Sequence, residues 1–234
     1  MVAVGIPPVI NPYDENALEL ALQIKDHWGG KVIALNMSEK ATSPILKKAL
    51  SVGADELIIL EDPVFKDLTS FGTAEVLSGG IRKIKSFDLI VTGRQSADWD
   101  SGQVGLLIAG ILKIPGISLV QKVDMEDGSI IVQRLRRNGY EVMETHLPAL
   151  VTVSSEAGDL RLPTLKAIQE ARKKQVTVWR RGDLGVDPAL LRKRAIRAIT
   201  PPPLMARNCF FIDGQSAEEK VGKLILRLRQ DRVV

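Results

Sequence analysis

The stretch Asp88 to Gly105, DLIVTGRQSADWDSGQVG, predicts a buried strand, a small polar turn and an apolar helix in direct succession. Leu89 to Val91 form the strand, Thr92-Gly93 ends it, and apolar residues return at helical spacing after Gln103. A helix that starts directly after a strand presents unpaired backbone N–H groups, and these suit a phosphate. An ordinary connection, in which an acidic side chain such as Asp100 caps the helix, fits the same residues, so both interpretations stay open.

Strand and helix patterns alternate on the N-terminal side of this turn. Helices are expected from Asn11 to Gly29-Gly30, from Ser43 to Gly53 and from Thr73 to Ile84, with strands at Lys31–Asn36 and Glu56–Leu60. Such repeats predict an α/β fold with a mostly parallel, doubly wound sheet that helices cover on both faces. Because ligands bind at the carboxyl ends of the strands in Rossmann-like sheets, the turn lies at an end of the sheet where a ligand would bind.

The residues after the turn predict an antiparallel addition to the sheet. Ser118–Val123, Ser129–Leu135 and Tyr140–Ser154 have the composition of strands. Asp127-Gly128 and Asn138-Gly139 stand between them and are strong hairpin-turn signals.

The chain is expected to divide after residue 178. Residues 1–178 form the nucleotide-binding α/β domain, and residues 179–234 form an extended arm that ends in a helix. The regular pattern of the arm is interrupted at Gly182, Gly185, Pro188 and Pro201-Pro202-Pro203. Ser216 to Arg229 resumes helical spacing, with Ser216 and Glu219 as a capping box. This helix is expected to cover either the domain or another subunit.

Composition excludes several classes of function. The net charge of +4 and the pI near 9.2 raise nucleic acid as a partner. However, the sequence has no aromatic stacking set, and acidic residues are interspersed along most of it, so a protein or nucleotide partner fits better. With two histidines and one cysteine, a zinc site, a histidine triad and an intrachain disulfide are not expected. Cys209 is expected to pack in the interior.

No signal peptide or membrane span is expected, because the apolar runs are short and no basic region precedes a long hydrophobic stretch. A cytoplasmic location follows as an expectation.

Several stretches in order resemble one known family, the beta subunit of electron transfer flavoprotein. The central match is TGRQSADWDSGQVG from Thr92 to Gly105. The other matches are NPYDENALE from Asn11, VGADELIIL from Val52, LPALVTV from Leu147, RLPTL from Arg161, DLGVD from Asp183 and SAEEKVGKL from Ser216. Together they extend over most of the chain, so they are far more specific than one glycine-containing turn.

The resemblance implies an electron carrier subunit rather than an enzyme. Such a subunit pairs with an alpha subunit and relays electrons from flavin dehydrogenases, such as acyl-CoA dehydrogenases, to a quinone reductase or a similar acceptor. The redox FAD is shared with the alpha subunit, and the beta subunit holds either AMP or a second FAD.

The resemblance also implies site residues. The nucleotide-binding stretch corresponds to Thr92, Gly93, Gln95, Asp98, Asp100, Ser101, Gly102, Gln103, Val104 and Gly105. Arg161 and Leu165 correspond to partner-binding positions, with Leu165 as an exposed anchor for the dehydrogenase and the basic run Arg172 to Lys174 after it. By periodicity alone, Leu165 could instead pack inward together with Ile168.

The chain departs from the family pattern at three places. Gly102 and Val104 stand where many relatives have Asn and Thr, and Leu135, beside the retained Arg134, stands where many have a glutamate near the redox flavin. A strand resembling VCVKQVPD, which normally comes before the Asn-Pro-Tyr-Asp segment, is not found. A misplaced start, a partner that fills the gap and an impaired nucleotide site are all consistent with this departure.

Two other classes of protein remain as alternatives. A regulatory nucleotide-binding protein of the stress-protein type would share the fold, but it would not predict the proline-containing arm. An ATP-using enzyme is suggested by Ser78-Gly79-Gly80, although these residues lie within a helical pattern and no phosphate-binding lysine motif follows them.

Overall fold

The computed structural model describes residues 9–39, 43–198, 200 and 209–233. The chain forms two compact units that divide between Ala195 and Ile196. This division comes later than residue 178, where the sequence predicted it. The reason is that Leu184 and Leu191, which follow the predicted boundary, are buried in the core of the first unit.

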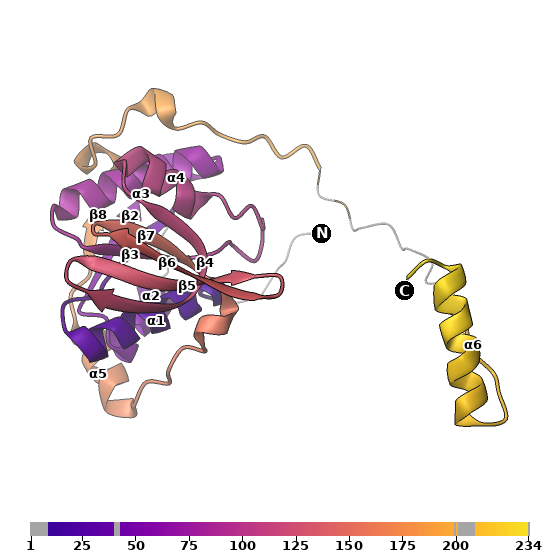
Figure 1. The fold of residues 1–234 in the computed structure, drawn as a ribbon. Coiled ribbons are helices and arrows are strands. Elements are labelled where there is room, and N and C mark those ends of the chain that lie inside the picture. Colours follow the sequence, from indigo (N-terminus) through magenta and orange to yellow (C-terminus); the bar gives the residue numbers. More distant parts are fainter. Residues whose placement is uncertain (1–8, 40–42, 199, 201–208, 234) are drawn as a thin grey trace. The chain divides into compact units, whose positions relative to one another are not determined.

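The strands of the first unit form two sheets (Figure 1). The smaller sheet has the order β1-β2-β8 and is entirely parallel. The larger has the order β3-β7-β4-β5-β6, in which the first three strands are parallel and the last two are antiparallel additions. The strands are β1 (Ile33–Ser38), β2 (Glu56–Glu61), β3 (Leu89–Gly93), β4 (Gly116–Glu126), β5 (Ser129–Arg136), β6 (Gly139–His146), β7 (Ala149–Val153) and β8 (Thr177–Trp179).

This arrangement differs from the single, mostly parallel sheet that the sequence predicted. Strands β1 and β3 are edge strands of different sheets, and neither pairs with the other. A strand leading into the first helix would, by the right-handed crossover rule, lie next to β1 on its free side. Within the described residues no such strand is present, so the parallel strands divide at this position.

Helices cover both faces of the strands (Figure 1). On one side lie α1 (Pro12–Trp28), α2 (Ser43–Val52) and α5 (Leu165–Lys173), and on the other lie α3 (Ser70–Ile84) and α4 (Val104–Leu112). The sequence explains the limits of α1, because a proline starts it, acidic residues occupy its first turn, and Gly29 ends it with a φ of 78°.

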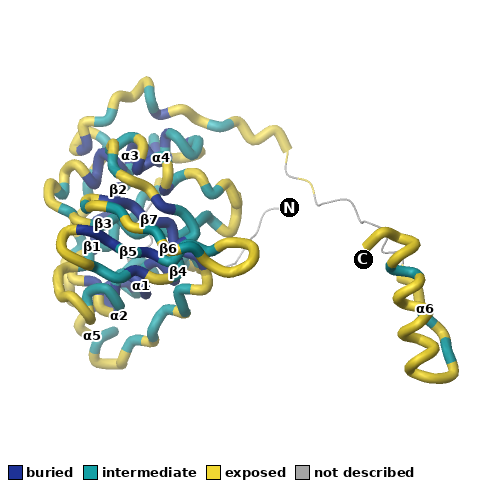
Figure 2. Tube along the Cα trace, in the orientation of Figure 1, coloured by how far each residue is buried: buried dark blue, intermediate teal, exposed yellow. Residues whose placement is uncertain are grey.

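Two helices hold the sheets together. On α1, Leu18 packs against the cluster that contains Ile59 of the smaller sheet, whereas Leu20 belongs to the cluster that contains Val151 of the larger. On α3, Val76 packs with the cluster around Leu60, and neighbouring residues of the helix pack with the cluster around Leu150. Figure 2 shows the buried residues concentrated in the strands and in the faces of these helices.

The predicted strand from Tyr140 to Ser154 is interrupted. Strand β6 ends at His146 and β7 begins at Ala149, with Pro148 between them. Proline has no backbone N–H to donate to a neighbouring strand, so it separates an outer antiparallel strand from a central parallel one.

The second unit contains the helix α6 (Ala217–Gln230). The hydroxyl of Ser216 accepts a hydrogen bond from the backbone N–H of Glu219 at 3.2 Å, as expected for the predicted helix start. No residue of α6 is buried within this unit. Cys209 is exposed, so the expectation that it packs in the interior is wrong. The predicted break at Pro201-Pro202-Pro203 lies outside the described residues.

Among the described residues, no helix combines the length and the apolar character needed to cross a lipid bilayer.

The free edges of β1 and β3 predict a pattern of hydrogen exchange. Among the described residues, β7 has a partner strand on each side, whereas β1 and β3 have a partner strand on one side only. We expect the alternate amides of β1 and β3 that point away from their one partner to exchange about tenfold or more faster than those of β7. Exchange measured by NMR tests this, and equal protection of all three strands would contradict it.

Candidate functional site

Strand β3 continues directly into the turn between β3 and α4. Thr92 and Gly93 belong to β3, so the prediction that they end the strand before them is wrong. The turn then takes up residues 94–103 and contains two left-handed backbone positions, Asp100 with a φ of 54° and Gly102 with a φ of 61°. Glycine adopts this conformation without strain, and aspartate is one of the few other residues that tolerate it.

Gly105 lets α4 approach the sheet closely. A Cβ atom at this position would lie 2.6 Å from Oγ1 of Thr92 and 2.7 Å from Cγ2 of Thr152. A side chain here would therefore displace the first turn of α4 from the carboxyl ends of β3 and β7. The close approach of Gly105 to Thr92 thus places the end of the turn and the start of α4 against the sheet.

The start of α1 holds the turn in place. The side-chain amide of Asn11 donates to the carbonyl of Gln95 at 2.8 Å, and its carbonyl accepts from the backbone N–H of Ala97 at 3.1 Å. One carboxylate oxygen of Asp14 accepts from the backbone N–H of Gly93 at 3.0 Å. The sequence identified this segment only as a helix start, yet Asn11 makes no capping hydrogen bond to α1. Instead, its side chain contacts residues more than eighty positions away in the sequence.

Asp14 lies in an environment that opposes its charge. Loss of hydration raises the pKa of the Asp14 carboxyl above its usual value, while hydrogen bonds from Asn11 and Gly93 act in the opposite direction.

The acidic side chains of the turn do not cap α4. The carboxylate of Asp100 accepts a hydrogen bond from the side-chain amide of Gln95, and that of Asp98 accepts from the backbone N–H of Trp99 at 2.9 Å. Gln103 occupies the capping position and makes no side-chain capping bond. The capping interpretation of Asp100 is therefore wrong, and the first N–H groups of α4 have no side-chain cap.

A shallow hollow of about 640 Å³ lies in front of this helix end. It is formed where the first turns of α3 and α4 come together. Ser70 of α3 and Ser101 of the turn are joined by a hydrogen bond of 3.3 Å between their hydroxyls. The lining residues are Thr69, Ser70, Phe71, Gly102, Gln103, Leu106 and Leu107.

The sequence did not predict that residues at the start of α3 line this hollow. Thr69 caps α3 through a hydrogen bond from the backbone N–H of Gly72 at 3.2 Å. The Thr-Ser pair at a helix start after a strand was the available signal. The first turns of two helices, each a source of positive potential, thus border one hollow.

The predicted nucleotide residues lie along the one turn but differ in their surroundings. Gly102 and Gln103 line the hollow, and Val104 begins the helix behind it. Ser101 joins the turn to α3, and Gln95 is held by Asn11. Thr92, Gly93 and Gly105 lie in or against β3, and Asp98 and Asp100 are exposed.

A second surface lies around the start of α5. Leu165 is the first residue of α5 and is 82% exposed, and Leu162 just before it is 90% exposed. The alternative that Leu165 packs inward is therefore wrong. Ala171 is buried on the opposite face of α5, which fixes the orientation of the helix.

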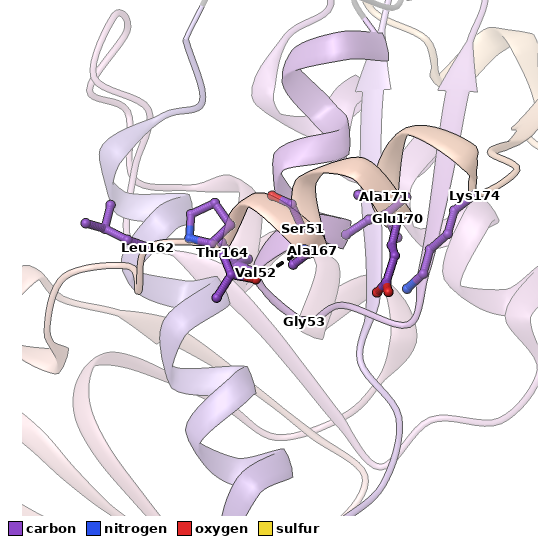
Figure 3. A pocket seen from close by; sticks show the side chains of 11 residues that line it. Ser51, Val52, Gly53, Leu162, Thr164, Ala167, Glu170, Ala171 and Lys174 are labelled. Carbon is purple, nitrogen blue, oxygen red and sulfur yellow. Dashed lines mark hydrogen bonds between the residues drawn. The ribbon is translucent and has the colours of Figure 1, made fainter.

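A hollow of about 380 Å³ lies between α5 and the end of α2 (Figure 3). Figure 3 shows Leu162 at one end of it and Glu170 with Lys174 at the other. This hollow is not at the turn between β3 and α4, and none of the predicted nucleotide residues lines it.

Arg161 is held by ion pairs within the subunit. Its guanidinium contacts the buried carboxylate of Glu19 at 2.9 Å and that of Asp26 at 2.7 Å. Burial by itself raises the pKa of Glu19, but the hydrogen bonds from Arg161 outweigh this effect and hold that pKa below its usual value. Arg161 therefore ties the segment that carries Leu162 and Leu165 to α1.

Comparisons with known proteins show the family of this chain. A family model described as the electron transfer flavoprotein domain matches residues 2–184. The chain belongs to the electron transfer flavoprotein family. An electron transfer flavoprotein subunit beta from Thermoanaerobacterium thermosaccharolyticum is 39% identical over 236 residues, which cover 98% of this chain and 89% of the relative.

Two further relatives extend the comparison. The caffeyl-CoA reductase-Etf complex subunit CarD of Acetobacterium woodii is 35% identical over 240 residues, which cover 100% of this chain and 91% of the relative. The protein FixA of Azorhizobium caulinodans is 35% identical over 190 residues, 78% of this chain and 68% of the relative. These similarities give this member of the electron transfer flavoprotein family the role of a beta subunit.

The glycines that suggested an ATP-using enzyme have a packing role in this beta subunit. Gly79 and Gly80 lie within α3. A Cβ atom on Gly79 would lie 2.6 Å from Cγ2 of Val186, and one on Gly80 would lie 2.9 Å from Cδ1 of Leu60. Gly80 lets α3 approach the smaller sheet closely, and Gly79 lets the segment around Val186 pack against the helix.

Removal of the Asn11 side chain tests the tie between α1 and the turn. We expect Asn11→Ala to lower the free energy of unfolding by about 1–3 kcal/mol, because two hydrogen bonds to the turn are lost and one peptide N–H and one carbonyl lose their partners. Chemical denaturation measures this change. Gln175→Ala is the matched control, since Gln175 is an exposed amide on the surface. Equal stability of the two variants would contradict the assignment.

Proposed function

We propose that this beta subunit forms a heterodimer with an alpha subunit and relays electrons between flavoproteins in the cytoplasm. The donors are flavin dehydrogenases such as acyl-CoA dehydrogenases, and the acceptor is a quinone reductase or a similar protein. The chain acts as an electron carrier and turns over no substrate by itself. The observation that carries the nucleotide part of the proposal is the uncapped start of α4 beside the hollow.

The cofactors are an FAD shared with the alpha subunit and an adenylate held by this chain, which belongs either to AMP or to a second FAD. The shared FAD supplies the redox chemistry when it is bound. The adenylate phosphate is stabilised by the first N–H groups of α4, and the partial charge of a helix end contributes about 0.3–1 kcal/mol at an exposed site.

The residues of the turn fit such a ligand. Gly102 has no side chain, so a phosphate can approach the backbone N–H groups that follow it. Gln103 can donate through its amide. Val104 cannot replace the hydroxyl that many relatives carry there, so recognition rests on backbone groups. The carboxylate of Asp98 suits a ribose hydroxyl rather than a phosphate.

The second unit supplies a surface for the alpha subunit. Within that unit, α6 exposes Val221, Leu224, Ile225 and Leu226. A stripe of this kind on a helix is normally covered by another structure. The proposed pairing segment is residues 179–234, as the sequence predicted. The second unit, which forms the later part of this segment, begins at Ile196.

Leu165 provides the contact with the dehydrogenase. An exposed leucine that enters a partner's pocket removes apolar area from water, at about 25 cal/mol per Å². Arg172, Lys173 and Lys174 are exposed at the end of α5 and favour an acidic partner surface. Arg161 contributes by holding this segment on α1 through Glu19.

The cofactor content of the heterodimer tests the proposal. The chain is co-expressed with an alpha subunit, the flavin is quantified by absorbance, and the extracted nucleotides are identified. We expect either one FAD and one AMP for each heterodimer or two FADs. A correctly assembled pair with neither an AMP nor a second FAD would contradict the nucleotide site, and a pair without flavin would contradict the carrier role.

Truncation of Leu165 tests the docking surface. We expect Leu165→Ala to weaken interaction with the donor dehydrogenase by about tenfold, which is about 1.4 kcal/mol. The free energy of unfolding should change by less than about 0.5 kcal/mol, because the side chain is on the surface. The measurement is the KM for the flavoprotein in dehydrogenase turnover, with Val9→Ala as the control because Val9 is 78% exposed elsewhere. An unchanged KM would exclude Leu165 as the anchor.

A further inference from the structure

The hollow between α5 and the end of α2, which we call the α5 hollow, has an apolar floor. Three of its lining residues are buried, namely Leu50 and Val52 of α2 and Ala171 of α5. Ala167 of α5 also lines it (Figure 3). Its volume of about 380 Å³ is open to solvent, so a large apolar side chain from outside can enter it.

Hydrogen bonds fix the two helices that form the α5 hollow. The Nζ of Lys47 on α2 donates to the carbonyl of Arg172 on α5 at 2.8 Å, and the Nζ of Lys174 donates to the carbonyl of Ala54 at 3.4 Å. At the other end of α5, the hydroxyl of Thr164 accepts from the backbone N–H of Ala167 at 3.2 Å. Because both ends of α5 are held, a bound side chain would not have to order the hollow, which lowers the cost of binding.

Two exposed leucines border the α5 hollow. Leu162 lies at one end of it (Figure 3), and Leu165 is the first residue of α5. Leu165 and Ala167 are two positions apart on a helix, so their side chains do not face each other. The surface therefore carries a projecting leucine next to a hollow. A partner that receives Leu165 comes within reach of the hollow as well.

The charge around the α5 hollow limits which partner fits. From Leu165 to Lys174 the chain carries four cations and one carboxylate, which are Lys166, Arg172, Lys173, Lys174 and Glu170. Helix α6 of the same chain also exposes apolar residues, but it carries four cations and two carboxylates, which are Lys220, Lys223, Arg227, Arg229, Glu218 and Glu219. Like charges thus disfavour α6 or a second copy of it as the occupant, and an acidic partner surface is favoured.

We propose that the α5 hollow receives an apolar side chain of the donor dehydrogenase, from a surface with carboxylates around that side chain. This inference rests on the proposed function, in which Leu165 enters a pocket of the same dehydrogenase. The contact is then reciprocal, because each protein supplies one projecting side chain and one hollow. In protein interfaces, side chains that fill preformed pockets carry much of the binding energy.

Substitutions that fill the α5 hollow from within test the inference. In Ala167→Phe the ring takes the space that the partner's side chain would occupy. The probe is the acyl-CoA dehydrogenase for which the wild-type heterodimer has the lowest KM. We expect Ala167→Phe to raise this KM by about tenfold and to leave kcat unchanged. Ala167→Leu, which fills less of the hollow, raises KM by a smaller factor.

Gln169→Phe is the matched control. Gln169 is exposed on the same helix and does not line the α5 hollow, so this variant should keep KM within about twofold of the wild-type value. None of the predicted nucleotide residues lines the hollow, so the flavin and nucleotide content of the heterodimer should be unchanged in all variants. Melting temperatures show that each variant is folded.

The double variant Leu165→Ala/Ala167→Phe separates the hollow from the leucine. If the two contacts are separate, the factors by which the single changes raise KM multiply. A double variant with the same KM as Leu165→Ala alone would mean that the ring acts only by displacing Leu165, and this would overturn the inference.

The remaining outcomes separate the inference from the function on which it rests. If the wild-type heterodimer accepts electrons from the dehydrogenase but Ala167→Phe keeps its KM, the α5 hollow is not a docking site and the proposed function stands. If Ala167→Phe instead weakens association with the alpha subunit, the hollow belongs to the subunit interface and the inference is wrong. If the wild-type heterodimer accepts no electrons from any flavin dehydrogenase, the proposed function fails, and the inference fails with it.

Discussion

The contact between the start of α1 and the end of β3 is the constraint on which the rest of the site depends. Asn11 and Asp14 together bind the backbone at Gly93, Gln95 and Ala97. These contacts are made at the carboxyl edge of the larger sheet, where the chain has just left β3. Because they fix the first part of the turn, the later part can place Gly102 and Gln103 before the start of α4 without a capping side chain. The proposed anion site, made of backbone N–H groups, needs this support, since no side chain of α4 defines it.

The same helix has a second role, which is to hold together two sheets that are not paired with each other anywhere in the described part of the chain. Some residues of α1 pack on the smaller sheet and others pack on the larger sheet. Residues of α3 likewise pack on both sheets, from the opposite face. The fold is therefore tied together by side-chain packing at the position where a continuous sheet would have main-chain hydrogen bonds. The turn between β3 and α4 lies at this junction, and so the geometry of the site depends on how α1 is seated.

Much of the fold follows from local sequence patterns. The limits of α1, α2 and β2 and the start of α4 are close to those predicted, because apolar periodicity, prolines and glycines act over a few residues. The hairpin at Asp127-Gly128 is present for the same reason. The second hairpin turns at Arg137-Asn138, one residue earlier than predicted, and Gly139 is the first residue of β6. The exposure of Leu165 came from the family resemblance, because periodicity allowed either orientation.

The features that the sequence did not predict are contacts between distant residues. The tie of Asn11 to the turn joins residues more than eighty positions apart, and no local pattern reveals it. The position of Thr69 to Phe71 beside the turn depends on how α3 and α4 pack. The division between the units was placed too early because glycines and prolines after Trp179 looked like an arm, although Leu184 and Leu191 return to the core. Glycines and prolines that interrupt regular structure do not show whether the chain leaves a domain or returns to its core.

The central claim is that backbone N–H groups at the start of α4 bind an adenylate phosphate. Titration of the isotope-labelled heterodimer with AMP, followed by amide NMR, tests it most directly. The account predicts saturable shifts concentrated at Gly102, Gln103, Val104 and Gly105, with smaller shifts at Ser70 and Phe71. No saturable shift in this group, or shifts confined to the hollow beside α5, would contradict it.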